Sequence, residues 1–285
     1  MFLLLATICP ASADSLLART HYAEVRGDPK AGNAGARAAE LIDEAVPRLA
    51  PLVGTSDLNP ISARVYLDRA TFAKGAGIPQ NAPIVGIATF PSGIIHIDAT
   101  DMLESIERIV PHEVAHVLIA RCLGPSLDAL PTWLNEGIAE YAAGTAASQV
   151  DPVALQAVGR GEAIPLASLD ASFHLDNTAQ PLAYAEAASL VNFMVAKRGP
   201  SVIRDLLGAV RSRHDFPSSL MHVTGWNMEE LESGWRQSVS RRWRWYLFFY
   251  SQAPILGLMV LLFVIGYLRY RYDRRRRQEM PDTDW

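Results

Sequence analysis

Residues 111–118 of the chain read Pro-His-Glu-Val-Ala-His-Val-Leu. His112 and His116 are four residues apart, so on a helix their imidazoles share one face and can bind the same tetrahedral cation. Glu113 lies about 100° further round such a helix, where its carboxylate can reach a water on that cation without being a ligand. The stretch therefore predicts a helix that carries a metal site.

A second stretch, residues 130–144, reads LPTWLNEGIAEYAAG and predicts another helix, with Pro131 near its first turn. Glu136 lies 20 residues after His116 and is the best candidate for a third ligand. Two histidines and a glutamate would leave one coordination position of a zinc ion open to water. Glu140, one turn further on, can accept the outward ring N–H of a ligating histidine.

The remaining pattern predicts an α+β fold, with a small N-terminal sheet and a helical C-terminal half. Apolar residues at helical spacing predict helical structure over 34–53. Short β-branched runs predict strands at 64–68, 84–89 and 93–98, the last two as a hairpin. Helical patterns follow at 111–123, 131–143, 183–198, 200–213 and 226–243. Because proline disrupts a helix interior, we expect the metal-binding helix to begin at or just before Pro111, after a separate segment at 105–110.

The segments PHEVAHVL and LPTWLNEGIAEY resemble the gluzincin metallopeptidases. The run WLNEG-x-A-x-Y is similar to both the aminopeptidase N group and the peptidase MA family, and the absence of a GxMEN-type motif together with the chain length favours the latter. Residues 163–173 and 183–199 also resemble the C-terminal half of that family. The resemblance covers roughly residues 35–240.

This resemblance implies a zincin-like metalloprotease domain that hydrolyses peptides or proteins. It implies zinc ligation by His112, His116 and Glu136, with Glu113 as general base on a zinc-bound water. It also implies that Tyr184 stabilises the oxyanion, although the apolar residues around Tyr184 would equally suit a tyrosine of the core. Zincins that resemble this chain present substrate along a sheet edge, and the strand at 93–98 is our candidate for that edge.

The net charge of −4 hides a segregated distribution. Residues 14–240 carry 17 Lys and Arg against 26 acidic residues, whereas residues 241–285 carry nine Arg against four. The mild acidity argues against nucleic-acid binding. Within the basic tail, residues 245–268 are uncharged and mostly apolar, which predicts one transmembrane helix in contact with lipid.

Six arginines follow this apolar stretch and three precede it, which predicts that residues 269–285 form a cytoplasmic tail. Residues 1–13, MFLLLATICPASA, resemble a secretory signal peptide. Together these features predict a single-pass protein of the cell membrane whose domain, residues 14–240, lies outside the cytoplasm. The sequence does not indicate an oligomeric state.

Alternative interpretations remain open at this point. A zinc-stabilised, non-catalytic ectodomain could serve as a binding or assembly module, although a purely structural zinc site usually has a fourth protein ligand. An intramembrane protease is excluded because residues 104–121 carry five charged residues. His96 suits either a cleft or a buried hydrogen-bonded position, and Cys122 is expected to pack in the core.

Overall fold

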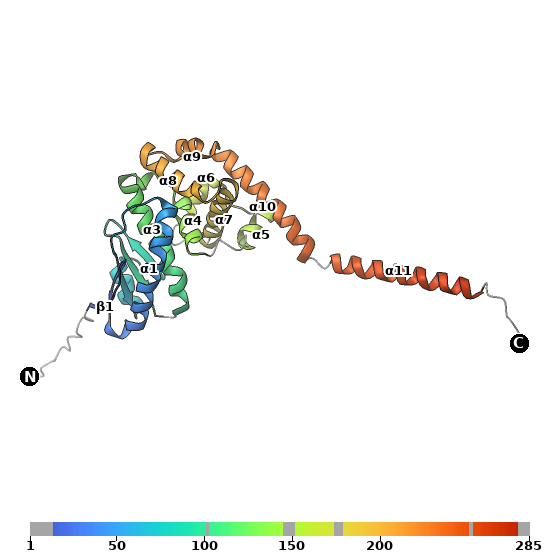
Figure 1. Cartoon of the computed structure of the whole chain (residues 1–285), viewed down its shortest axis with the longest axis horizontal. Helices are drawn as coiled ribbons and strands as arrows, with labels where there is room; N and C mark the ends of the chain where they lie inside the picture. Colours follow the sequence, from blue (N-terminus) through green and yellow to red (C-terminus); the bar gives the residue numbers. More distant parts are fainter. Residues whose placement is uncertain (1–13, 101–102, 145–151, 174–178, 251–252, 279–285) are drawn as a thin grey trace, which may run out of the picture.

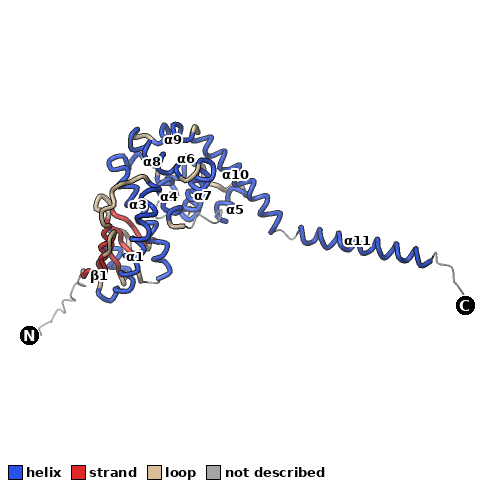
Figure 2. Tube along the Cα trace, viewed as in Figure 1, coloured by secondary structure: helices blue, strands red, loops and turns tan. Residues whose placement is uncertain are grey.

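A computed structural model describes residues 14–100, 103–144, 152–173, 179–250 and 253–278 of the chain. The described part is predominantly helical and contains one small mixed sheet (Figure 2). The α+β prediction is therefore wrong, because helix far exceeds strand in these residues. The difference arises because short helices also occupy the joints between the predicted segments. These are α2 (Arg69–Ala76), α5 (Pro152–Arg160), α6 (Leu166–Leu169) and α9 (Phe216–Thr224).

The sheet contains five strands in the spatial order β1-β2-β3-β5-β4. Their bounds are β1 Ser15–Arg19, β2 Ala23–Gly27, β3 Ile61–Tyr66, β4 Gly86–Thr89 and β5 Ile94–Asp98. The pairs β2–β3 and β3–β5 are parallel, whereas β1–β2 and β4–β5 are antiparallel. The predicted hairpin is thus confirmed, but β5 has neighbours on both sides. The free edge of the hairpin is β4, so the expectation that residues 93–98 form the edge is wrong.

Two long helices, α1 (Gly32–Val53) and α3 (Leu103–Leu123), pack against each other and against the sheet. The strands contribute alternate apolar residues to this core, as a half-buried sheet requires. Ile95 and Ile97 are fully buried there, and α3 adds a stripe at four-residue spacing, Ile106, Val110, Val114 and Leu118. The helix that carries the two histidines is therefore fixed along its length.

Helix α3 passes through Pro111 without ending, so the prediction of a helix start there is wrong. Proline at this position removes one backbone hydrogen bond, at a cost of about 3 kcal/mol. The buried stripe of α3 continues on both sides of Pro111, from Val110 to Val114. Burial of these side chains over several turns outweighs the missing bond.

The second half of the domain consists of helices stacked beside α3. Helix α4 (Thr132–Ala142) packs on α7 (Gln180–Arg198), and α8 (Ser201–Arg213) packs on α3 and α9. Contact between α4 and α7 is close, because a Cβ on Gly137 would lie 2.6 Å from the carbonyl oxygen of Ala187. In the described residues, the 3₁₀ segment η2 (Gly124–Ala129) joins α3 to α4 and η3 (Asp170–Phe173) follows α6, whereas η1 (Pro29–Ala31) lies between β2 and α1.

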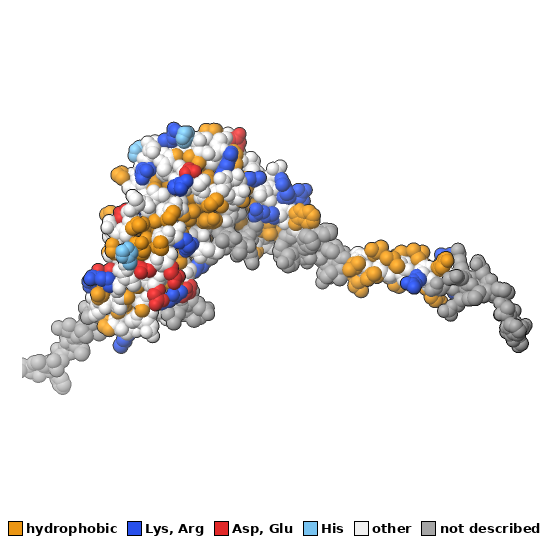
Figure 3. Space-filling view, viewed as in Figure 1, with side chains coloured by type: hydrophobic (Ala, Val, Ile, Leu, Met, Phe, Trp, Pro, Cys, Tyr) orange, Lys and Arg blue, Asp and Glu red, His pale blue; other side chains and the backbone are white. Residues whose placement is uncertain are grey.

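Helix α10 (Met228–Tyr250) runs across α5 and brings its Trp243 over Gly159. A Cβ on Gly159 would lie 2.4 Å from the Trp243 ring, so the two helices touch through a glycine and an indole. Helix α11 (Ala253–Gln278) then extends away from the domain (Figure 1). Its apolar side chains between Leu256 and Leu268 are exposed (Figure 3).

The predicted transmembrane helix over residues 245–268 is wrong. That range is divided between the end of α10 and the start of α11, and the charge-free part of α11 reaches only from residue 253 to residue 268 before the arginines begin. None of the helices in the described residues combines the length and apolar character needed to cross a membrane. The predicted single-pass localisation and lipid contact are wrong for the same reason. Residues 1–13, the predicted signal peptide, lie outside the described residues.

Candidate metal centre and adjoining cavity

The two histidines of α3 and the glutamate of α4 meet where these helices pack together. Nε2 of His112 and Nε2 of His116 lie 3.1 Å apart. Oε2 of Glu136 lies 3.4 Å from the first of these nitrogens and 3.5 Å from the second. The structure thus brings together all three residues that the sequence predicted as ligands, each with one ligand atom directed at a common point.

The outward nitrogens of both imidazoles also have partners. Oε1 of Glu140 lies 3.4 Å from Nδ1 of His112, and Oδ1 of Asn135 lies 3.1 Å from Nδ1 of His116. Acceptors at Nδ1 favour the tautomer whose Nε2 carries a free lone pair, which is the form a metal ligand needs. The predicted contact of Glu140 is therefore present, whereas Asn135 was missed. Its only signal in the sequence is its position directly before Glu136.

The charges at this cluster are strongly coupled. Burial of His112 opposes its protonation, but the adjacent carboxylates of Glu136 and Glu140 outweigh burial and raise its pKa to about 10. Burial also opposes ionisation of Glu136, yet the adjacent His116 and His112 hold its pKa well below the usual range. Without a cation, the carboxylate of Glu136 is thus balanced by the protonated imidazole of His112.

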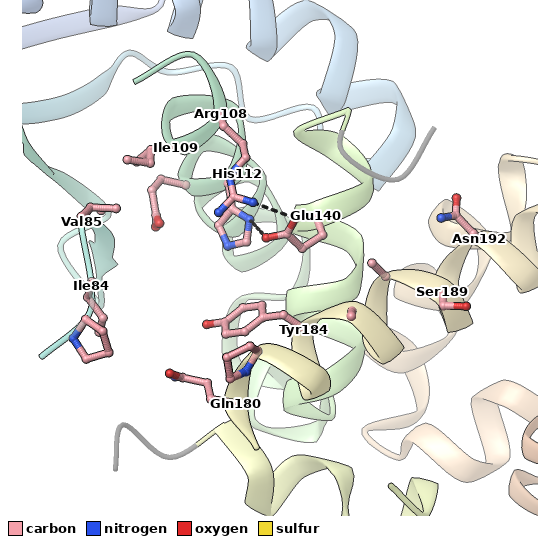
Figure 4. Close-up of a pocket in the computed structure, with 16 residues that line it drawn as sticks. Ile84, Val85, Arg108, Ile109, His112, Glu140, Gln180, Tyr184, Ser189 and Asn192 are labelled. Carbon is pink, nitrogen blue, oxygen red and sulfur yellow. Dashed lines mark ion pairs between the residues drawn. The ribbon is translucent and has the colours of Figure 1, made fainter. Parts of the chain in front are cut away.

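A cavity of about 470 Å³ opens beside this cluster. His112 and Glu140 line it on one side and Tyr184 on another, while Ile84 and Val85 lie in the facing wall (Figure 4). Glu113 also lines the cavity, and residues 83–86 all contribute to its lining. Arg108 lies at the same cavity, with its Nη1 atom 4.0 Å from Oε2 of Glu140. The edge strand β4 therefore begins at the cavity, next to α3, the helix that carries the two histidines.

Glu113 and Tyr184 both have raised pKa values. Burial penalises the charged carboxylate of Glu113 and outweighs the opposing effect of His116 and His112. Burial also raises the pKa of the Tyr184 hydroxyl, and the carboxylates of Glu136, Glu113 and Glu140 add to that effect. The phenol is half-buried, packs edge-on against Phe173 and retains its proton at neutral pH. Tyr184 is thus a hydrogen-bond donor at the cavity.

Two further residues considered from the sequence lie away from this site. His96 is buried on β5, with its Nδ1 atom 2.9 Å from Oη of Tyr66, and it does not line the cavity. Cys122 is buried, and its Sγ donates to the carbonyl oxygen of Val53. Each of these buried side chains therefore has a hydrogen-bond partner within the fold.

A helix with two histidines four residues apart, followed by a helix that carries a glutamate aimed at them, is the donor arrangement of a hydrolytic metal site. A comparison with protein-family models agrees with this class. The chain belongs to the peptidase MA superfamily, whose model matches residues 41–241. Among curated proteins no significant match is found. Membership in this superfamily indicates a peptidase, and the matched range contains the whole cluster and its cavity.

Proposed function

We propose that this chain is a zinc-dependent peptidase that hydrolyses peptide bonds in the cavity beside His112. The observation that carries the proposal is the convergence of two imidazole nitrogens and one carboxylate oxygen on one point. Oε2 of Glu136 is buried and has no hydrogen-bond partner, which is costly unless a cation takes that place. Nitrogen and oxygen donors of this type suit zinc, so the residues fit the ion that the superfamily generally uses.

When bound by these donors, zinc would supply Lewis-acid chemistry and lower the pKa of a coordinated water. Glu113 lies in the cavity beside the histidines, and burial raises its pKa toward the range where a carboxylate can both accept and release a proton. We assign it the role of general base toward water and then of proton donor to the leaving amine.

Tyr184 faces the same cavity from α7 and keeps its proton. We assign its hydroxyl the role of donating a hydrogen bond to the oxyanion that forms as the peptide carbonyl is attacked. β4 is an edge strand of the sheet and begins at the cavity with Gly86, and the backbone N–H of its Ala88 donates to the carboxylate of Glu113. An extended peptide can pair with such an edge and so present its backbone to Glu113 and Tyr184.

Substitution Glu113→Gln tests this function. The variant removes the base and leaves the three proposed ligands in place, so we expect hydrolysis of a quenched-fluorescent peptide library to fall at least 1,000-fold (about 4 kcal/mol). Zinc content, measured by mass spectrometry of the purified protein, should stay near one ion per chain. The matched control is Glu162→Gln, an exposed position away from the cavity, which should leave both quantities unchanged.

The same experiment distinguishes the rival function, a zinc-stabilised binding module without catalysis. That module would bind zinc and hydrolyse no peptide, in the wild type as in the variant. The cavity that adjoins the cluster favours catalysis, because a purely structural metal site has no need of one. Full activity in Glu113→Gln would contradict the assigned mechanism.

A further inference from the structure

The wall of the cavity that faces α3 is formed by a segment without regular secondary structure. Residues 79–85 connect α2 to β4, and Pro83, Ile84 and Val85 from this segment line the cavity together with Gly86. Such a segment lacks the hydrogen-bond ladder that holds a strand or helix, so its backbone groups need other partners. The position of this wall therefore depends on contacts from outside the segment.

One guanidinium supplies most of these contacts. Nε of Arg69 donates to the carbonyl oxygen of Gln80 at 3.0 Å, Nη2 donates to that of Ala82, and Nη1 donates to that of Ile84. Arg69 thus binds three alternate carbonyls from α2, and it is not among the residues that line the cavity. The rigid planar fork of arginine holds such a set of acceptors in one arrangement.

Arg69 is itself fixed by a buried carboxylate. Oδ2 of Asp98 accepts from Nη1 of Arg69 at 2.9 Å, while Oδ1 accepts from the backbone N–H of Thr100 at 3.0 Å. The backbone N–H of Asp98 donates to the carbonyl oxygen of Val85 at 2.8 Å. Asp98 thus ties the guanidinium and the cavity wall to β5, the strand next to β4.

Small displacements of this wall matter, because it lies close to α3. A Cβ on Gly86 would be 2.2 Å from Cγ2 of Ile109 and 3.4 Å from Oε1 of Glu113. Because the backbone at Gly86 lies so close to α3, a shift of the wall would change the width of the cavity. It would also change the distance between β4 and Glu113.

We propose that Arg69, held by Asp98, is a positioning residue that fixes the Pro83–Gly86 wall and the start of β4 for the binding of extended peptides. This inference rests on the proposed peptidase function. It places the control of peptide binding in a residue that touches neither substrate nor metal. Removal of the guanidinium should weaken the binding of peptides long enough to pair with β4, while the proposed ligands and Glu113 keep their places.

Hydrogen–deuterium exchange on the full chain tests the positioning directly. In Arg69→Ala we expect backbone amides of residues 80–89 to exchange at least tenfold faster, with α3 and α4 unchanged. Arg121→Ala is the matched control, because Arg121 also binds loop carbonyls, those of Asn59 and Pro60, which do not line the cavity. Equal exchange of residues 80–89 in the two variants would overturn the proposal.

Kinetics then test the consequence for substrate. Eight-residue quenched-fluorescent peptides that the wild type cleaves are compared with their four-residue truncations. In Arg69→Ala we expect KM for the longer peptides to rise about tenfold, with kcat within about twofold and zinc content unchanged. Arg69→Lys, which can satisfy some of the carbonyls, should restore part of the affinity.

Each outcome has a distinct meaning. The positioning role would be contradicted if kcat and KM of Arg69→Ala changed by the same factor for the eight-residue and four-residue peptides. It would also be contradicted if Arg121→Ala showed the same changes as Arg69→Ala. A wild type that cleaves none of the peptides would contradict the proposed function instead, and the exchange experiment would then decide the role of Arg69 by itself.

Discussion

Oδ1 of Asn135 lies 3.1 Å from Nδ1 of His116, on the residue directly before the proposed ligand Glu136. One turn of α4 therefore supplies both the carboxylate that we propose as a metal ligand and a hydrogen-bond partner for a histidine of α3. Together with Glu140 at Nδ1 of His112, this contact gives each histidine an acceptor at its outward nitrogen.

Substitution Asn135→Ala should weaken zinc binding without removing a ligand. Loss of the acceptor frees the His116 ring to rotate and to adopt the other tautomer, and such outer contacts typically change metal affinity 10- to 100-fold. Competition with a chromogenic chelator measures the affinity. The control is Asn192→Ala, which removes another amide side chain that lines the cavity and should bind zinc as the wild type does. Unchanged affinity in Asn135→Ala would remove Asn135 from the metal centre.

Substitution Tyr184→Phe should lower kcat by about 100- to 1,000-fold with little change in KM. The phenylalanine keeps the packing against Phe173 but lacks the hydroxyl that we assign to the oxyanion. Steady-state hydrolysis of a peptide measures both constants, and thermal unfolding checks that stability is retained. A variant with wild-type kcat would show that Tyr184 only packs beside the cavity.

Substitution Gly86→Ala should destabilise the chain by about 1–3 kcal/mol and impair hydrolysis, since the new methyl group would collide with Ile109. The double variant Gly86→Ala, Ile109→Ala should recover part of the loss, because the second change removes the colliding atom. Chemical unfolding of the single and double variants gives the coupling energy. Strict additivity would mean that β4 and α3 are not in contact at this point.

A buried glutamate away from the metal centre should make stability depend on pH. Glu186 on α7 accepts from the backbone N–H of Ile164, and its Oε2 is buried without a hydrogen-bond partner. Burial raises its pKa from 4.5 to about 7. The folded state therefore holds the proton more tightly than the unfolded state, so this contribution to stability is fully present below pH 4.5 and is lost as pH rises to 7 and above.

We expect a loss of about 2 kcal/mol between pH 5 and pH 8, which is less than the full effect because part of the change occurs below pH 5. Urea unfolding at pH 5 and pH 8 measures it in the metal-free protein. Glu186→Gln, which cannot ionise, should abolish this component of the difference. A variant with the same pH dependence as the wild type would assign the effect to other groups.

The proximity of the three candidate ligands could be predicted from the sequence, because its signal is local, whereas their role as metal ligands stays a prediction. Four-residue spacing on one helix and a glutamate on the next suffice to identify His112, His116 and Glu136, and helix packing then brings them together. The roles of Glu113 and Tyr184 stay predictions, although both residues line the cavity.

The missed features depend on contacts between distant segments. Strands β1 and β2 were not predicted, because charged residues such as Arg19, Glu24 and Arg26 interrupt their apolar alternation. β5 lies inside the sheet because it pairs with β3, and the chain between these two parallel strands includes α2 and β4. Arg69 carries no motif, and only the fold shows that it meets the 80–84 carbonyls.

The contact between Gly159 and Trp243 bears on where the folding unit ends. The family model stops at residue 241, two residues before the indole that packs over Gly159. A chain cut at that boundary would keep the metal centre but leave the bare Gly159 surface of α5 facing water. The packing of the domain therefore extends at least two residues past the limit of family similarity, and α5 packs in part on a residue outside that limit.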